Sequence, residues 1–306
     1  SSIGLKSPSE VEMKRLLANY QKGGYEEAEK LALSIIKEFP DHPFSYKVLG
    51  GIFKQMGRLS ELVIVSEKVV ELAPEEAESH NNLGITLKEL DRLEDAEVSY
   101  RKAIALNLNY AEAHSNLGIT LQELGRLEEA EASYNKAIKL KSDYAEVHYN
   151  LGITLQELGR LQEAETSYNK AIELKSDYVE SFYNLGNMLQ GMGRLEEAEV
   201  SYRQLIALNL KYVARAFNNL GITLQELGRV EEAEASFNKA IESKPEYSSA
   251  FINRAKLFFK LGSFEAALKD ADFCNTKSSR LVALESLYAL GRVEEVYQRI
   301  EVQSEL

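Results

Sequence analysis

One decapeptide, Leu-Gly-Ile-Thr-Leu-Gln-Glu-Leu-Gly-Arg, occurs three times in this chain, at residues 117–126, 151–160 and 220–229. The first two copies begin 34 residues apart, and the third begins 69 residues after the second, which is two periods plus one residue. A fixed period of this length constrains the fold strongly, because each period has to form one supersecondary unit that buries its apolar face by stacking on its neighbours.

The period places repeat starts near residues 9, 43, 77, 111, 145, 179, 214 and 248, after an N-terminal tail of residues 1–8. Residues 277–306 are expected to form a degenerate ninth repeat or a C-terminal cap. We number positions in a repeat from these starts. Leu and Gly occupy positions 7 and 8, Gly recurs at position 15, Ala at position 20 and an aromatic residue at position 24. Apolar residues at positions 4, 7, 8 and 11 form one helical stripe, and a glycine at position 15 suits a helix end. Each repeat is therefore predicted to be a helix–turn–helix.

This set of positions resembles the tetratricopeptide repeat family, strongly over residues 9–276 and weakly beyond them. The resemblance implies an all-α fold, a right-handed superhelix (α-solenoid) of eight helix–turn–helix repeats plus a degenerate ninth. It also implies that the first helix of each repeat lines a concave groove. The family's tryptophan at position 4 is absent here, and histidine or another aromatic residue replaces it, as in His80, His114 and His148.

The face opposite the buried stripe of each first helix contains positions 2, 5, 6, 9 and 13, since successive side chains turn by about 100°. Position 6 carries an asparagine in six consecutive repeats: Asn82, Asn116, Asn150, Asn184, Asn219 and Asn253. An amide is both donor and acceptor, as the backbone of an extended peptide requires. The register resembles the asparagine ladder in the repeat arrays of O-linked N-acetylglucosamine transferases, which implies peptide binding. The alternative is that these amides only support the helix surface.

Two further positions complete the predicted peptide-binding face. Position 9 carries Ile85, Ile119, Ile153 and Ile222, which either contact a guest peptide or pack against the next repeat. Position 13 carries glutamates, among them Glu123 and Glu157, which predict an acidic groove that prefers basic segments. The glutamates at position 2 are expected to belong to capping boxes instead, since Asn109 precedes Glu112 and Asp143 precedes Glu146 by three residues.

Charge and motifs exclude several classes of function. The formal net charge of −12 opposes binding to nucleic acid and to anionic membrane surfaces, and no apolar stretch approaches the length of a membrane span. The three position-4 histidines are too far apart along a stack to share a metal ion. Cys274 is the single cysteine, which fits a reducing, cytoplasmic location. No phosphate loop or nucleophile motif occurs, so neither a cofactor nor enzyme activity is expected.

The sequence therefore predicts a protein-binding scaffold whose groove takes an extended peptide, with a preference for basic segments, or a partner helix. Two alternatives stay open. The chain could be the substrate-recruiting arm of a larger glycosyltransferase or oxygenase, since it opens with Ser1-Ser2 and no methionine, as an excised fragment would. It could also self-associate through its terminal repeats, using apolar residues of the segment 293–306.

Three local features carry smaller expectations. The extra residue near 211–215 should change the stacking angle or lengthen a helix, and the first helix of the ninth repeat should be short. The arginines at position 16, such as Arg126 and Arg229, are expected to be solvated turn residues.

Overall fold

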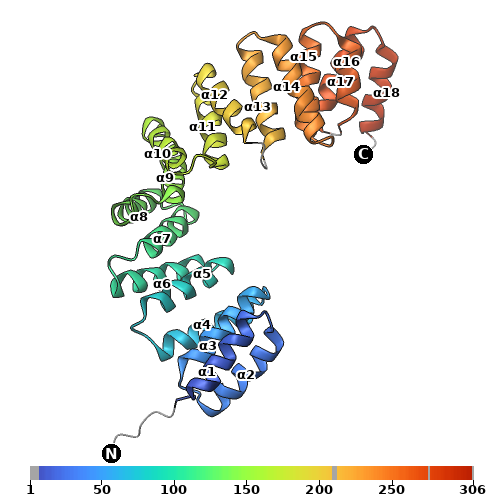
Figure 1. The fold of residues 1–306 in the computed structure, drawn as a ribbon. Coiled ribbons are helices and arrows are strands. Elements are labelled where there is room, and N and C mark those ends of the chain that lie inside the picture. Colours follow the sequence, from blue (N-terminus) through green and yellow to red (C-terminus); the bar gives the residue numbers. More distant parts are fainter. Residues whose placement is uncertain (1–6, 209–211, 275, 305–306) are drawn as a thin grey trace, which may run out of the picture. The chain divides into compact units, whose positions relative to one another are not determined.

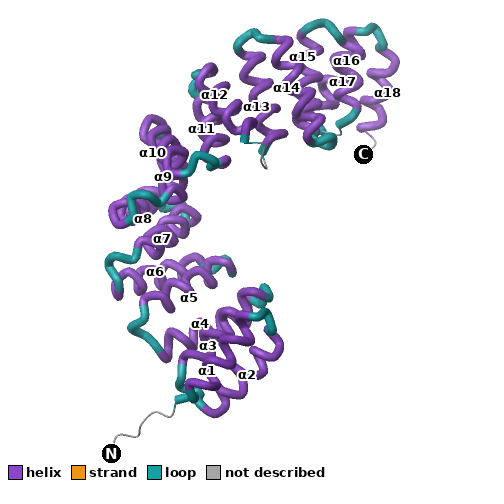
Figure 2. Tube along the Cα trace, viewed as in Figure 1, coloured by secondary structure: helices purple, strands orange, loops and turns teal. Residues whose placement is uncertain are grey.

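The computed structural model describes residues 7–208, 212–274 and 276–304, with side chains up to residue 300. Within these residues there are eighteen α-helices and no strand, which confirms the all-α prediction (Figures 1 and 2). None of the described helices combines the length and the apolar character that crossing a membrane would require. Most of the predicted N-terminal tail, residues 1–6, lies outside the described part of the chain.

The chain divides into two compact units, residues 1–160 and residues 161–306, which we call the N-terminal and C-terminal units. The helices of the N-terminal unit are α1 (Glu10–Gln21), α2 (Tyr25–Glu38), α3 (Pro43–Gln55), α4 (Leu59–Leu72), α5 (Ala77–Glu89), α6 (Leu93–Leu106), α7 (Ala111–Glu123), α8 (Leu127–Leu140) and α9 (Ala145–Glu157). Those of the C-terminal unit are α10 (Leu161–Leu174), α11 (Val179–Gly191), α12 (Leu195–Ala207), α13 (Val213–Glu226), α14 (Val230–Ser243), α15 (Ser248–Lys260), α16 (Phe264–Asp272), α17 (Lys277–Ala289) and α18 (Val293–Ser304).

Within each unit, every helix packs against the next one in the sequence, as Figure 1 shows. The odd-numbered helices are the first helices of the repeats, and several of them also approach one another: α5 approaches α7, and α7 approaches α9. The small alanines at position 20 allow the two helices of a repeat to lie close together. Ala96 in α6 and Ala130 in α8 are fully buried where these helices pack against their neighbours. Each repeat therefore contributes one first helix to a row within its unit.

A glycine and an aromatic ring hold each of these helix pairs together. A Cβ atom on Gly118 in α7 would lie 2.6 Å from Cε1 of Tyr134, whose side chain in α8 is fully buried. Real Cβ contacts are almost never below 3.0 Å, so only glycine lets the ring lie this close to the α7 backbone. The Leu-Gly signature of the sequence thus marks the point where the second helix presses its ring onto the first.

Two irregularities differ from their sequence expectation. Helix α17 has a full 13 residues, so the expectation of a short first helix in the last repeat is wrong; the shortened helix is α16, with 9 residues. Residues 209–211 lie outside the described chain, but α13 has 14 residues where α11 and α15 have 13. The extra residue near position 213 is therefore accommodated at least partly by a longer helix.

Candidate functional site

The amides at position 6 fall into two groups in the structure. Nδ2 of Asn116 donates to Oδ1 of Asn81 in the preceding repeat at 3.0 Å, and Nδ2 of Asn253 donates to Oδ1 of Asn218 at 2.9 Å. In both cases a position-6 amide binds a position-5 amide across the repeat junction. One N–H donor of each position-6 amide therefore joins two neighbouring repeats, and its second N–H and its oxygen can bind other partners.

Asn219 belongs to the same stacking group through a larger network. Its Nδ2 donates to Oδ1 of Asn187 at 2.8 Å, and the same oxygen accepts from the hydroxyl of Tyr202, also at 2.8 Å. Asn218 donates to Oδ1 of Asn219 at 3.1 Å. Because the network joins α11, α12 and α13, it fixes the orientation of the Asn219 amide.

Asn82 and Asn150 form the second group. Asn82 is exposed and Asn150 half-buried, and neither side chain has a hydrogen-bond partner among the described residues. Asn184 is half-buried and does have a partner within the chain. Two of the six predicted amides, both in the N-terminal unit, are thus available to a ligand with all their donors and acceptors.

The isoleucines and glutamates lie at accessible places on the same helices. Ile85, Ile119, Ile153 and Ile222 are all half-buried. Glu123 is exposed and lies 3.1 Å from Nζ of Lys88, and Glu157 is exposed and accepts from Nε2 of Gln122 at 3.3 Å. The position-13 glutamates therefore contact the position-12 residue of the preceding repeat, and these exposed contacts contribute little to the free energy of folding.

The capping boxes expected at position 2 do not form. The N-cap residues of α7, α9 and α11 are Tyr110, Tyr144 and Tyr178, and none makes a side-chain capping bond. The residues expected as caps, Asn109 and Asp143, come one residue too early to reach the helix N–H groups. Capping boxes occur instead at Ser9 with Glu12 and at Thr276 with Ser279. Glu78, Glu112 and Glu146 are therefore exposed carboxylates without a capping role.

A pocket of about 410 Å³ opens between α3, α4 and α5 in the N-terminal unit. Its lining includes Glu78, Asn82, Ile85 and Glu89, which are positions 2, 6, 9 and 13 of a single repeat. Residues that the sequence assigned to one face thus converge on one cavity. Its volume falls within the ~300–1,000 Å³ typical of small-molecule sites.

A smaller pocket of about 240 Å³ lies in the C-terminal unit, between α13, α15 and α17. Predicted residues line it too, because Ile222 and Asn253 contribute to its wall together with Lys256 and Glu285. A cavity along the first helices of each unit thus includes predicted peptide-binding residues.

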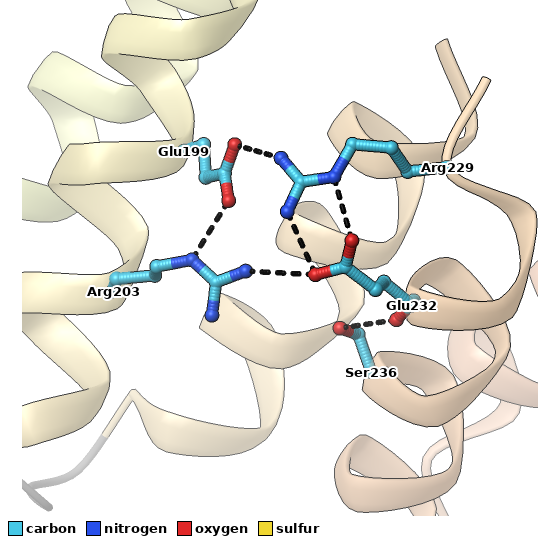
Figure 3. Close-up of polar contacts among 5 residues, drawn as sticks. All are labelled: Glu199, Arg203, Arg229, Glu232 and Ser236. Carbon is cyan, nitrogen blue, oxygen red and sulfur yellow. Dashed lines mark hydrogen bonds and ion pairs between the residues drawn. The ribbon is translucent and has the colours of Figure 1, made fainter. Parts of the chain in front are cut away.

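The arginines at position 16 lie in the turns and are partly exposed, as expected, but they also form ion pairs between repeats. Figure 3 shows Arg229, whose guanidinium binds Glu199 of the preceding repeat at 2.6 Å and Glu232 of its own repeat at 2.7 Å. Arg203 bridges the same two carboxylates, at 2.8 Å and 3.4 Å. Arg58, Arg92, Arg126 and Arg194 likewise bind one carboxylate in each of two repeats. The stripe is a ladder of ion pairs that joins neighbouring repeats.

The histidines and the cysteine are placed as structural residues. Nε2 of His80 lies 2.9 Å from the carbonyl oxygen of Pro74, and Nε2 of His148 lies 3.3 Å from that of Ser142, so each ring contacts the turn before its own helix. Cys274 is buried, which raises the pKa of its thiol, and its Sγ contacts the carbonyl oxygen of Ser248. Among the described residues, no cluster of metal-binding side chains occurs.

Comparison with known families identifies the chain. The tetratricopeptide repeat model matches residues 109–177, 143–211 and 177–246, and a second TPR repeat model matches residues 87–125. Together these matches cover residues 87–246, just over half of the sequence. The chain belongs to the tetratricopeptide repeat family.

Solved structures agree with this tetratricopeptide repeat assignment. YrrB, described as a TPR protein with an unusual peptide-binding site, is 26% identical, with a TM-score of 0.52 over 60% of this chain and 95% of its own. MamA is 25% identical, with a TM-score of 0.50 over 52% of this chain and 93% of its own. The APC/C hetero-tetramer Cut9–Hcn1 is 15% identical, with a TM-score of 0.56 over 93% of this chain and 57% of that one, and shows the fold alone. No curated protein sequence matches the chain.

Two features of this tetratricopeptide array were missed by the sequence reasoning, although both left a signal. The ion-pair ladder follows from a glutamate 29 residues before most of these arginines and an acidic residue 3 residues after them, as for Glu97, Arg126 and Glu129. The spacing is 30 residues for Glu199 and Arg229, across the extra residue of the chain. The amide pairs follow from asparagine at position 5 of one repeat and position 6 of the next, as in Asn81 and Asn116. Both signals cross a repeat boundary, so neither is visible on the face of a single helix.

Proposed function

We propose that this tetratricopeptide repeat protein is a non-catalytic scaffold that binds extended peptide segments of partner proteins along the first helices of its repeats. Tetratricopeptide repeats generally mediate protein–protein interactions, and the proposal specifies where this chain would do so. The observation that carries it is the 410 Å³ pocket, which gathers positions 2, 6, 9 and 13 of one repeat. A peptide side chain in that pocket would leave its backbone beside the amide of Asn82.

The chemistry of this face suits an extended, basic guest. Asn82 and Asn150 each offer a donor and an acceptor to a peptide backbone, and the half-buried isoleucines Ile85, Ile119 and Ile153 offer apolar contact between them. The position-2 carboxylates have no capping role, so they add to the negative charge along the row. Complementary charge speeds encounter and suppresses wrong partners, which favours segments rich in Lys or Arg.

The similarity to YrrB also supports a peptide ligand. That protein is described as having an unusual peptide-binding site, and its match covers 60% of this chain at 26% identity. The register of the asparagines, which resembles the ladder of O-linked N-acetylglucosamine transferases, predicts the same kind of ligand.

Replacing Asn82 and Asn150 together by Ala tests the proposal. Peptides selected from a random display library on the wild-type chain should bind the double variant about 10- to 30-fold more weakly, since each lost hydrogen bond contributes roughly 1 kcal/mol. Asn116 is left unchanged because its amide also binds Asn81. The melting curve should not change.

A control for the loss of two amides replaces Asn135 and Asn169, which are exposed asparagines on the second helices α8 and α10, away from the first-helix face. This variant should bind the selected peptides as the wild type does. Equal affinity of the Asn82/Asn150 variant and the wild type, or an equal loss in the control, would remove the groove proposal.

A second function is favoured by the surface of α18. Tyr297 is 63% exposed and Ile300 is 48% exposed, beside Val293 at 40%, so the helix presents an apolar strip suited to a second copy of the chain. Sedimentation at several concentrations tests self-association, and substituting Tyr297 and Ile300 by Lys should abolish any dimer. A wild-type chain that remains monomeric at every concentration rules it out.

Two further proposals concern the setting of the chain. As the recruiting arm of a larger enzyme, it would use the same face, and the length of the full gene product distinguishes that role from a free-standing scaffold. A cytoplasmic location is proposed from the single cysteine, Cys274, and a fluorescent fusion of the full-length protein tests it.

A further inference from the structure

Several repeats share one packing contact, in which an aromatic ring at position 24 covers the glycine at position 8. A Cβ atom on that glycine would lie 2.5–2.7 Å from the nearest ring atom in four repeats, and the four rings are fully buried. The pairs are Gly84 with Tyr100, Gly118 with Tyr134, Gly186 with Tyr202 and Gly221 with Phe237. The chain itself thus shows that this slot accepts a phenyl or phenol ring.

The second repeat keeps the glycine and lacks the ring. Gly50 stands at position 8 of α3, and position 24 of α4 is Ser66. The atoms nearest to a Cβ on Gly50 are Cδ1 of Leu62 at 3.6 Å and Cγ2 of Val65 at 3.7 Å, which is ordinary contact. Gly50 is half-buried, whereas Gly84, its counterpart in the next repeat, is buried. Leu62 and Val65 therefore fill only part of the slot that a ring fills elsewhere.

The unfilled part of the slot is the 410 Å³ pocket. Gly50, Leu62 and Ser66 line it on the side of α3 and α4, and Asn82 and Ile85 line it on the side of α5. Helices α3 and α5 approach one another less than α5 and α7 do, which leaves room for a side chain to enter between them. The slot is therefore continuous with the face proposed to hold the peptide backbone.

Position 12 supplies the polar end of the slot. In the ring-filled repeats, the hydroxyl of Tyr134 donates to Oε1 of Gln122 at 3.2 Å, and that of Tyr202 donates to Oε1 of Gln190 at 3.0 Å. In the second repeat position 12 is Lys54, which lines the pocket.

Lys54 is also free to meet a ligand. The next repeat pairs Lys88 with Glu123 at 3.1 Å, but between the equivalent residues Lys54 and Glu89, both within the described chain, no ion pair forms. Lys54 is exposed at the pocket, so its ammonium group can donate a hydrogen bond to a phenol oxygen that enters the slot.

We propose that this pocket takes a tyrosine side chain of the bound peptide, with its ring against Gly50 and its hydroxyl at Lys54. The guest ring replaces the one that the other repeats provide from their own second helix. Glu78 and Glu89 line the same pocket, so basic residues next to the tyrosine complement its charge. The identity of the ligand as a peptide rests on the proposed function, but the ring slot can be tested without any peptide.

The slot is tested with p-cresol, the side-chain analogue of tyrosine, on the full chain with labelled methyl groups. Addition of p-cresol should shift the methyl resonances of Leu62, Val69 and Ile85, with a Kd of about 1–10 mM for so small a ligand. Toluene should bind several-fold more weakly, and Lys54→Ala should abolish that difference. Lys139→Ala, an exposed lysine on α8, is the matched control and should retain it.

Filling the slot from within provides the second variant. Ser66→Tyr places the chain's own ring at position 24, as in the other repeats, and should abolish the p-cresol shifts while the methyl resonances of Ile119 and Ile153 stay unchanged. Wild-type protein without shifts at the pocket, or a Ser66→Tyr variant with unaltered shifts and intact helicity, overturns the slot.

The peptide part has its own readout. Display libraries selected on the wild type should be enriched in tyrosine next to Lys or Arg, and libraries selected on Ser66→Tyr should not. Equal tyrosine frequency in the two selections overturns the assignment of the guest side chain. A library without binders overturns both the proposed function and the peptide guest. The p-cresol shifts still test whether the slot binds a ring, because they need no peptide.

Discussion

Alanine at position 8 should have opposite effects in two repeats of the same unit. Gly118→Ala places a Cβ atom 2.6, 2.7 and 2.9 Å from three ring atoms of Tyr134. The ring would have to retreat by roughly 0.8 Å to reach ordinary contact, but it is fully buried and its hydroxyl is bound to Gln122. Overpacking of this kind costs about 1–3 kcal/mol, and the better helix propensity of alanine offsets about 1 kcal/mol. A net loss of up to about 2 kcal/mol is expected.

Gly50→Ala meets no such obstacle. Its Cβ atom would lie 3.6 Å from Leu62 and 3.7 Å from Val65, both ordinary contacts, and α3 keeps its helical backbone. Only the propensity gain remains, so this variant should be more stable by about 0.5–1 kcal/mol. The two substitutions are chemically identical and differ only in whether a ring stands opposite.

Local hydrogen exchange is the appropriate assay, because each repeat contacts only its neighbours and the array need not unfold in one step. Gly118→Ala should lower amide protection in α7 and α8, and Gly50→Ala should raise it in α3 and α4. Tyr134→Leu added to Gly118→Ala should cost less than Tyr134→Leu alone, which a double-mutant cycle measures. The same sign of effect at Gly50 and Gly118, or an additive cycle, would refute the ring-against-glycine reasoning.

Two further predictions concern the turns and the ion pairs. Asp91 adopts φ +59° at position 15, where other repeats have glycine, so Asp91→Gly should stabilise α5 by about 0.5–1 kcal/mol in urea unfolding, and Asp91→Ala should not. Hydrogen bonding from Arg229 lowers the pKa of Glu232, so the pair stabilises the fold above the unfolded pKa of about 4.3 and is lost as the pH falls through the folded pKa. Below about pH 4 the melting temperature should therefore fall, and Glu232→Gln should reduce that pH dependence.

The helices followed from the sequence because their determinants are local. Apolar spacing, a glycine at position 15 and alanine at position 20 act within one repeat, and the predicted helix pairs appear in the structure. The capping boxes were wrong for an equally local reason: the helices begin after Tyr110 and Tyr144, one residue beyond the expected caps, and a capping bond does not tolerate that shift.

The candidate site could be predicted only in part. The sequence identified the accessible positions, since Asn82, Ile85 and Glu89 do line one pocket. It could not sort the amides, because the side chains of Asn116 and Asn150 occupy the same position and differ only in what position 5 of the preceding repeat offers. Asn81 stands before Asn116, and Ser115 stands before Asn150.

By itself, the sequence determined the period, the helix pairing and the face on which each residue lies, because these depend on spacings within about one repeat. The tertiary structure alone decided which of those residues remain available to a ligand. Arg229, expected as a solvated turn residue, also links two repeats through its ion pairs, and Gly50 forms part of the wall of a pocket. Both outcomes depend on side chains that meet only when separate helices pack together. The spacing of residues along one helix does not determine the distance between side chains on two helices.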